Sequence, residues 1–444
     1  MPKPMAAKQC ASQVSEHAGS QPPRQQPEQR SIQLPSQPHV QPHAQLPSQP
    51  LPQPPTQPPN LTPTVRSHTR RAWIELDRDN LHHNVALVSQ LLADHCELMP
   101  AVKANAYGHG AAEISRELSL LGVHAFCVAS VDEGIELRQA LECSDMLSDN
   151  VSEILILGYT HPDQFYLLQR YQLTQTAVDY EHAMAIAEFG RRYHVKLPIH
   201  LKIDTGMRRL GIKSENRLDI MQVLSCKHLN VTGIYTHFST RNYDFTLAQA
   251  QRFDALLTFI TESGFSLPKV HSQSSYGVFA CQNYAFDHAF DYARVGLALY
   301  GIHANDGGSS GLPDLRPVLS LRARVSCVKD IRAGEFIGYG AEFQATLDMK
   351  IAILSIGYAD GVPRSLSNGV GQVLVNGSVA KVVGLICMDQ MTVDVSDIDD
   401  VYQGGTATLI GKDGDQEIKV VDIARQAGTI PNEILSRLGS RLDR

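Results

Sequence analysis

The sequence predicts an α/β protein in which a (β/α)8 TIM-like barrel is followed by a mostly β C-terminal domain. One reason is that short apolar segments typical of buried strands alternate with helical patterns eight times over roughly 230 residues, the size and count of such a barrel. The other is that this rhythm stops after Pro313, where short segments of alternating apolar and polar residues follow. We therefore expect a tail over residues 1–70, the barrel over 71–310 and the β domain over 311–444.

The barrel strands are expected where short apolar runs end in polar or glycine residues. A strand-like segment at Arg71–Asp77 opens the folded part and leads into a helix. A doubly wound open sheet is the alternative, but it would be expected to show a Gly-rich turn if it bound a dinucleotide, and the sequence has none. The eight barrel strands are expected at Pro100–Asn105, Ala125–Ser130, Ile154–Gly158, Thr176–Asp179, Ile199–Asp204, Val231–His237, Lys269–Ser274 and Ala293–Tyr300.

The second domain is expected to contain a β-hairpin. Asn376-Gly377 separates two alternating apolar runs, which is the strongest short-range signal for a hairpin. A short helix is expected near Ile434–Leu438. The strands of this domain are expected at Leu319–Val325, Ile351–Ile356, Gly371–Val375 and Ala380–Ile386.

The composition argues against several classes of function. The formal net charge of −7 gives no electrostatic reason to expect binding to nucleic acid or to an anionic membrane. No run of about 18 apolar residues occurs, so no membrane span is expected. Eight cysteines without paired or metal-like spacing predict free thiols in a reducing, cytoplasmic compartment and no metal centre. The tail is rich in proline and glutamine and poor in aliphatic residues, so we expect it to be disordered.

Lys103 is the first candidate for chemistry. It lies at the end of the strand expected from Pro100, and Gly108 and Gly110 open a turn into a helix near Ala111. The carboxyl ends of parallel strands carry the catalytic residues of α/β barrels. A partly desolvated lysine there loses its proton readily and can form a Schiff base. On position alone, a solvated lysine at a strand end explains the pattern at least as well.

Four further candidates lie within, end or follow expected strands. Arg209 belongs to a double arginine suited to a carboxylate, although such a pair is usually a solvated loop. His237 ends a strand, where a histidine is more often structural than catalytic. Ser275 lies in a strand-to-helix turn that suits a phosphate as well as it suits an ordinary polar loop. Arg294 lies in a long apolar segment, which argues mildly against an outward salt bridge.

The stretch Val102–Gly110 resembles the pyridoxal-phosphate lysine motif of the alanine racemase family, and similar motifs follow in family order. The resemblance covers about residues 71–444 and implies a pyridoxal 5'-phosphate-dependent homodimer. Such an enzyme interconverts L-alanine and D-alanine and supplies D-alanine for peptidoglycan. By the same resemblance, Lys202 aligns with a lysine that is carbamylated in some members, and Tyr358 and Asp389 with residues near the substrate channel.

The resemblance also implies roles for individual residues. Lys103 and Tyr339 are the two catalytic bases, one for each face of the substrate carbon, and Tyr339 reaches the site from the partner subunit. Arg209 and Met388 contact the substrate. Arg294 faces the pyridine nitrogen, where a guanidinium cannot accept a proton and discourages protonation of the ring. The implied cofactor contacts are Lys103, Tyr107, His237, Ser275, Arg294, Gly296 and Leu297.

Two departures from the family bear on the substrate. Ser440 falls where several alanine racemases carry a tyrosine beside the substrate methyl, which leaves room for a hydroxymethyl group. The segment Gln273–Gly277 is similar to that of the serine racemases of vancomycin-resistant bacteria, with Ser274 where asparagine is common. A serine or broad-specificity racemase is therefore one alternative. A non-catalytic pyridoxal-phosphate protein is another, although it needs no second base such as Tyr339. A decarboxylase usually keeps an acidic group where this chain has Arg294.

Overall fold

The computed structural model describes residues 70–142, 151–240, 242–280, 288–303 and 314–444. The tail expected over residues 1–70 lies, apart from Arg70, outside these ranges. In the described part of the chain, no helix is long and apolar enough to cross a membrane. Its five cysteines are free thiols, and no group of three His, Cys, Asp or Glu side chains there is placed to hold a metal ion.

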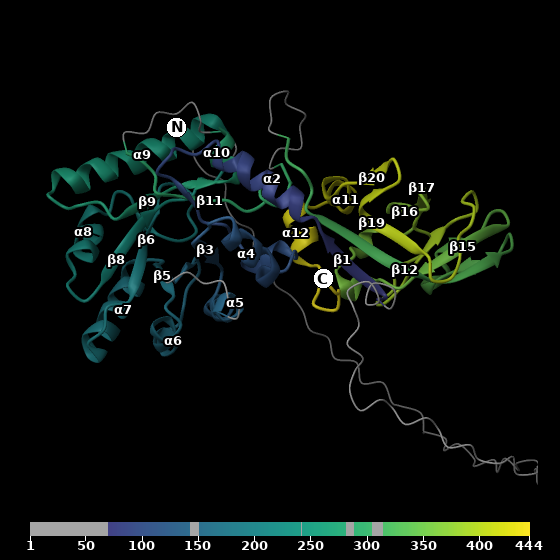
Figure 1. Ribbon diagram of the computed structural model, residues 1–444, viewed down its shortest axis with the longest axis horizontal. Helices are drawn as coiled ribbons and strands as arrows, with labels where there is room; N and C mark the ends of the chain where they lie inside the picture. Colours follow the sequence, from purple (N-terminus) through teal and green to yellow (C-terminus); the bar gives the residue numbers. More distant parts are fainter. Residues whose placement is uncertain (1–69, 143–150, 241, 281–287, 304–313) are drawn as a thin grey trace, which may run out of the picture. The chain divides into compact units, whose positions relative to one another are not determined.

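Parallel strands form a barrel in the first part of the described chain (Figure 1). The ring closes where the Val102 N–H donates to the Cys127 carbonyl oxygen (3.0 Å) and the Asp291 N–H to the Val270 carbonyl oxygen (2.8 Å). The predicted barrel is confirmed. Its strands are β2 (Glu97–Leu98), β3 (Ala125–Val128), β4 (Glu153–Ile156), β5 (Thr174–Ala177), β6 (Pro198–Asp204), β8 (Asn230–Tyr235), β9 (Lys269–His271), β10 (Gln273–Ser274) and β11 (Tyr292–Arg294), with the short β7 (Ile212–Lys213) beside β6.

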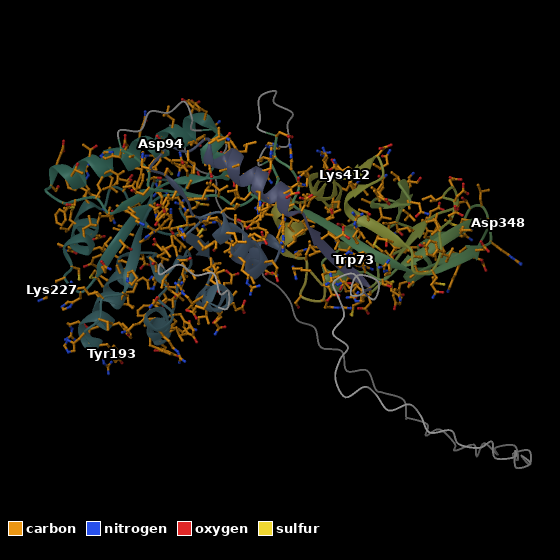
Figure 2. All side chains as sticks on the ribbon, viewed as in Figure 1. Trp73, Asp94, Tyr193, Lys227, Asp348 and Lys412 are labelled. Atoms are coloured by element: carbon orange, nitrogen blue, oxygen red, sulfur yellow. The ribbon has the colours of Figure 1, made fainter. Side chains whose placement is uncertain are left out.

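Helices cover the outside of the barrel (Figure 1). Aspartates cap two of them: Asp77 accepts the N–H of Asn80 (2.9 Å), and Asp179 accepts that of His182 (2.7 Å). Tyr193, at the end of one helix, lies on the outer side of this layer (Figure 2). The helices are α2 (Arg78–Ser89), α4 (Ala111–Leu120), α5 (Val131–Glu142), α6 (Phe165–Arg170), α7 (Tyr180–Tyr193), α8 (Arg217–Ser225), α9 (Tyr243–Glu262) and α10 (Ser275–Ala280).

Alternation along the strands separates two hydrophobic clusters. On β3, Phe126 and Val128 pack in the main core with residues of the surrounding helices. Ala125 and Cys127 point the other way and pack with Tyr292 of β11 in a smaller cluster inside the barrel. Polar side chains fill much of the remaining interior, and they build the site described below.

The strand predictions for the barrel are wrong in part at two places. The strand expected at Pro100–Asn105 gives way to a short helical turn, α3 (Lys103–Tyr107), in which four residues adopt left-handed backbone angles. The strand expected at Ala293–Tyr300 ends at Arg294 and continues as a turn, where the Leu299 N–H donates to the Gly296 carbonyl oxygen (2.9 Å). Apolar residues stay buried in both segments while the backbone turns, so hydrophobic periodicity does not reveal the change.

The second domain is mostly antiparallel β structure around the long strand β12. The predicted Asn376-Gly377 hairpin is confirmed, because it joins two strands whose Leu374 and Val379 lie opposite each other. Asp348, labelled in Figure 2, directly precedes β15. The elements are β12 (Leu319–Ile331), β13 (Phe336–Ile337), β14 (Phe343–Gln344), β15 (Met349–Leu354), β16 (Gln372–Val375), β17 (Ser378–Lys381), β18 (Met391–Asp394), β19 (Thr406–Asp413), β20 (Gln416–Ile418), α11 (Val420–Ala427) and α12 (Pro431–Ser436).

The first strand of the described chain, β1 (Ala72–Leu76), belongs to this second sheet. It runs antiparallel to β12, with Ala72 opposite Ala323 and Leu76 opposite Leu319. The strand itself was expected, but its segment was assigned to the barrel domain. Sequence order does not decide which sheet a strand joins, because pairing depends on contacts between distant segments.

Candidate active site

A cavity of about 540 Å³ opens at the carboxyl ends of the barrel strands, where α/β barrels place their active sites. Four lysine and arginine side chains line it, and none of the described residues that line it is an aspartate or a glutamate. Such a cavity favours an anionic ligand. The predicted site residues that line it are Lys103, Tyr107, Arg209, His237, Ser275, Arg294, Gly296 and Leu297; Lys202 and Asn432 line it as well.

Lys103 enters this cavity from a left-handed turn. Residues 104–107 have φ between 50° and 53°. Residues other than glycine pay about 1–2 kcal/mol each for that conformation, so tertiary contacts must hold the turn. Glu133 of α5 provides one, because its two carboxylate oxygens accept the N–H groups of Ala104 (2.8 Å) and Ala129 (2.7 Å). The carboxylate thereby ties the lysine turn to the end of β3.

Hydroxyl and backbone N–H groups gather on another wall of the cavity. The Ser275 hydroxyl oxygen accepts the N–H groups of Gly296 (3.1 Å) and Ala298 (3.3 Å). Gly296 lets the backbone approach Tyr107, since an added Cβ would lie 3.2 Å from the Tyr107 hydroxyl. Burial raises the pKa of Tyr107 to about 12, so this hydroxyl remains a donor at neutral pH. These groups, together with the absence of carboxylates among the described lining residues, fit a phosphate.

Arg294 is fixed from two sides inside the barrel. Its Nη2 donates to the Thr236 carbonyl oxygen (2.8 Å), and its Nη1 lies 2.5 Å from His271 Nδ1. The guanidinium also packs over the Tyr235 ring, 4.7 Å from its centroid. Although burial lowers its pKa from 12.5, an arginine stays protonated in proteins. The cavity therefore has a permanently cationic group that donates hydrogen bonds and accepts none.

Burial and this cation decide the charge of the neighbouring side chains. Burial, and then the charge of Arg294, lower the pKa of His237 well below 6.5, so its imidazole is neutral at pH 7. The same two causes lower the pKa of Lys202 well below 10.5. Lys202 packs over the Tyr235 ring at 4.6 Å, whereas Arg209 is exposed at the mouth. A lysine of lowered pKa beside an arginine is consistent with the implied modification of Lys202, which stays a prediction.

Three of the predicted residues lie outside the cavity of their own chain. Tyr339, Tyr358 and Met388 belong to the β domain, and they are 71%, 42% and 52% exposed. Backbone hydrogen bonds hold the last two segments together, because the Tyr358 N–H donates to the Cys387 carbonyl oxygen (3.0 Å) and the Ala359 N–H to the Met388 carbonyl oxygen (3.0 Å). The two predicted substrate-side segments are therefore neighbours, although they are distant in the sequence.

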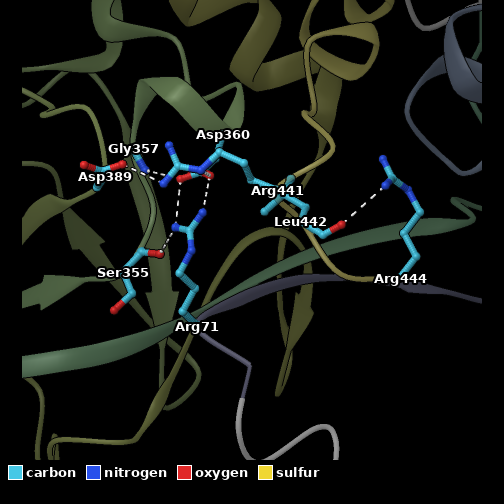
Figure 3. A network of polar contacts seen from close by, with 8 residues as sticks. All are labelled: Arg71, Ser355, Gly357, Asp360, Asp389, Arg441, Leu442 and Arg444. Carbon is cyan, nitrogen blue, oxygen red and sulfur yellow. Dashed lines mark hydrogen bonds and ion pairs between the residues drawn. The ribbon is translucent and has the colours of Figure 1, made fainter.

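Charged residues anchor these segments (Figure 3). The buried Asp360 accepts the Gly357 N–H (3.0 Å) and pairs with Arg71. Arg441 lies between two carboxylates, with Nε 3.4 Å from Asp360 Oδ1 and Nη2 2.6 Å from Asp389 Oδ1. Asp389, predicted beside the substrate channel, is thus part of a network that reaches the residue next to Ser440.

The sequence predictions missed several residues that shape the site. Glu133 holds the lysine turn, the Tyr235 ring lies beneath Lys202 and Arg294, and His200 extends the polar interior. The sequence did contain a signal for His200, because His200, Lys202 and Asp204 alternate with apolar residues on β6. Polar residues at this spacing share one face of a strand. Glu133 carried no such signal, since an acidic residue in the first turn of a helix is common.

Comparisons with known proteins support one family. The models for the N-terminal and C-terminal domains of alanine racemase match residues 76–304 and 318–444. An amino-acid racemase of Enterococcus faecalis is 41% identical over 393 residues, which cover 86% of this chain and 53% of that relative, so the chain spans about half of its length. An alanine racemase of Carboxydothermus hydrogenoformans is 38% identical over 378 residues. The match covers 84% of this chain and 99% of that relative. The crystal structure of alanine racemase from Bartonella henselae with covalently bound pyridoxal phosphate superposes with a TM-score of 0.72 at 28% identity. The superposition covers 84% of this chain and 99% of that structure.

A barrel joined to this kind of β domain, with a lysine at the mouth of a cation-lined cavity, places the chain in the class of barrel amino-acid racemases. The chain belongs to the alanine racemase family, since the two models of that family together match most of its length.

Proposed function

We propose that this protein is a pyridoxal 5'-phosphate-dependent alanine racemase. The observation that carries the proposal is the placement of Lys103 in a cavity with one further lysine, two arginines and, among the described lining residues, no carboxylate. The substrate is an amino acid with a free carboxylate, and the cofactor carries a phosphate, so both complement this charge.

The residues divide the work between binding and proton transfer. Tyr107, Ser275, Gly296 and Leu297 would hold the phosphate of the cofactor, and Lys103 would bear its covalent link. The bound cofactor supplies an electron sink for the negative charge that develops at the substrate Cα. Each enantiomer is made by removing the Cα proton on one face and returning a proton on the other.

Lys103 Nζ serves one face of the substrate Cα, and Tyr339 Oη of the partner subunit serves the other. Arg209 and Met388 hold the substrate carboxylate. Arg294 and His237 stay beside the cofactor as a fixed cation and a neutral imidazole, which restrict where protons can go. A cation that cannot accept a proton limits side reactions such as transamination.

The assembly that fits this division is a homodimer. Tyr339 is 71% exposed and does not line the cavity of its own chain, and Phe336 and Leu347 of the same domain are also exposed. Large apolar side chains gathered on one domain suit a protein interface. We propose a cytoplasmic dimer that supplies D-alanine for peptidoglycan.

The deciding experiment measures racemisation of L-alanine and of L-serine by the purified protein with pyridoxal phosphate. We expect alanine turnover that disappears in Lys103→Ala and falls by orders of magnitude in Tyr339→Phe, which keeps the ring but loses the hydroxyl. Binding of the cofactor with neither amino acid turned over would favour a non-catalytic pyridoxal-phosphate protein instead.

A second candidate function is racemisation of serine alongside alanine. Two observations favour it: the 41% identity to a protein described as an amino-acid racemase, and the small hydroxyl side chain of Ser440 next to the Arg441 network. A pocket that only tolerates an added hydroxyl discriminates poorly between the two substrates. Ser440→Tyr should lower the serine rate more than the alanine rate. Absence of any serine turnover by the wild-type enzyme would exclude this function.

A further inference from the structure

A chain of polar side chains runs from Arg294 through the barrel interior to Glu153, at the start of β4. Arg294 Nη1 lies 2.5 Å from His271 Nδ1, His271 Nε2 lies 2.9 Å from His200 Nδ1, and His200 Nε2 lies 2.9 Å from Glu153 Oε1. Both histidines are fully buried. The chain therefore links the cation in the cavity with a carboxylate outside it, which does not line the cavity.

The donor at one end determines the direction of every hydrogen bond in this chain. A guanidinium only donates, so His271 Nδ1 must accept and its proton must lie on Nε2. That proton points at His200 Nδ1, which must therefore accept as well. The remaining proton of His200 then lies on Nε2, and this nitrogen lies 2.9 Å from Glu153 Oε1 in an ion-pair contact that lacks the angle of a hydrogen bond. Both imidazoles are neutral, and both carry the proton on Nε2.

Close packing keeps both rings in place. His271 stacks on Tyr235, with centroids 4.6 Å apart and planes 9° apart, and it meets His200 edge to face at 4.9 Å. An added Cβ at Gly233 would lie 2.5 Å from His200 Cδ2, so only glycine leaves room for this ring. Because the rings cannot turn freely, the position of the protons depends on the partners at the two ends.

Glu153 is suited to be the accepting end. Burial opposes its ionisation, but contacts with His200, Tyr292 and Lys269 outweigh burial and lower its pKa below the usual range of a carboxyl group. Its Oε2 accepts the Tyr292 hydroxyl proton (2.9 Å) and lies 3.7 Å from Lys269 Nζ. The carboxylate is thus ionised and held from three sides at neutral pH.

We propose that Glu153 is a positioning residue of the active site, whose negative charge beside His200 Nε2 favours the same Nε2–H tautomers of His200 and His271 that Arg294 requires, and so keeps Arg294 in its donating orientation. The tautomers follow from the contacts alone. Only the expected change in racemisation kinetics rests on the proposed function. Without this carboxylate the Nε2–H of His200 loses its counter-charge, so the tautomer that places an N–H on His271 Nδ1 becomes accessible. Two donors then face each other, and the guanidinium moves.

The test combines nitrogen NMR of histidine-labelled holoenzyme with steady-state kinetics of alanine racemisation. In the wild type, His200 and His271 should both appear as neutral Nε2–H tautomers. In Glu153→Leu, the signals of both should shift toward the other tautomer, and kcat should fall roughly 10- to 100-fold, as when outer partners of ligand histidines are removed. The KM for alanine should change little. Glu153→Gln keeps an acceptor oxygen and should recover much of both properties.

Tyr292→Phe is the matched control, because it removes a hydrogen bond to the same carboxylate without breaking the chain. It should leave both tautomers unchanged. The proposal is overturned if wild-type His271 carries its proton on Nδ1 or is doubly protonated, or if Tyr292→Phe alters the spectrum as Glu153→Leu does. Where Glu153→Leu does not fold, a wild-type spectrum with either of those protonation states still overturns the proposal, and Glu153→Gln supplies the comparison with the negative charge removed. A wild type with the expected tautomers but no racemase activity would instead refute the proposed function.

Discussion

Arg71 and Asp360 lie 289 positions apart and form a two-point ion pair, with N–O distances of 2.5 and 3.1 Å. The Asp360 side chain is fully buried, whereas that of Arg71 is 36% exposed. Arg71 directly precedes β1, and Asp360 ends the short turn that begins at Tyr358. The pair thus connects the strand added to the second sheet with a segment expected to serve the substrate.

Asp360→Asn should destabilise the protein by about 3 kcal/mol, because it leaves Arg71 and Arg441 without their buried counter-charge. Denaturant unfolding measures the loss. Asp389→Asn is the control, since Asp389 pairs with Arg441 at a largely exposed site and should cost under about 1 kcal/mol. Equal losses in the two variants would mean that the buried carboxylate stabilises the fold no more than the exposed one does.

Glu133→Gln should weaken cofactor binding by loosening the left-handed turn that carries Lys103. The amide has one acceptor oxygen for two N–H groups, so one of the N–H groups of Ala104 and Ala129 loses its partner to water, at a cost of about 0.5–1.5 kcal/mol. Titration with pyridoxal phosphate, followed by absorbance, measures the change. Glu136→Gln alters an exposed residue of the same helix and should have no effect. An unchanged affinity in Glu133→Gln would mean that other contacts suffice to hold the turn.

Mixed dimers of two inactive variants should regain activity if Tyr339 acts across the interface. When Lys103→Ala and Tyr339→Phe subunits are mixed, one of the two sites in each mixed dimer combines an intact lysine with an intact tyrosine. Random reassortment should then restore about a quarter of the wild-type rate. Racemase activity after refolding the two variants together measures this, with each variant refolded alone as the reference. No recovery, in dimers shown to be mixed, would exclude the shared site.

Stability should fall as the pH drops from 6.5 to 4, in part because of His109. Burial lowers the pKa of His109 to about 4, and its Nδ1 lies 3.0 Å from the carbonyl oxygens of Ala106 and Tyr107. Above pH 6.5 the histidine is neutral in both states and contributes no pH dependence. Below it, the unfolded chain binds a proton that the folded chain does not, so stability decreases by about 2 kcal/mol at pH 5.

The unfolding free energy of the wild type and of His109→Gln at pH 7 and pH 5 tests this prediction. The variant should lose less stability between the two values, although the lowered pKa values of His237 and His271 leave it some pH dependence. The exposed His95 provides the control His95→Gln. The assignment to His109 fails if its replacement leaves the pH dependence as steep as in the wild type.

The sequence alone determined the order of elements and the region of the chemistry. Strands and helices alternate with the period that burial imposes, Asn376-Gly377 marks its hairpin, and the Lys103 stretch marks the part of the barrel where the cavity opens. These features are local, because each depends on which face of a short segment meets the core. The family motifs added the residues of the proposed site, eight of which line one cavity.

Only the tertiary structure decided what depends on distant segments. It assigns β1 to the second sheet, replaces a predicted strand end by the left-handed turn held by Glu133, and aligns His271 and His200 between Arg294 and Glu153. None of these follows from periodicity, because a buried charge or a strained backbone is tolerated only when a partner far along the chain compensates it. The sequence contains both partners, but only the fold brings them within hydrogen-bonding distance.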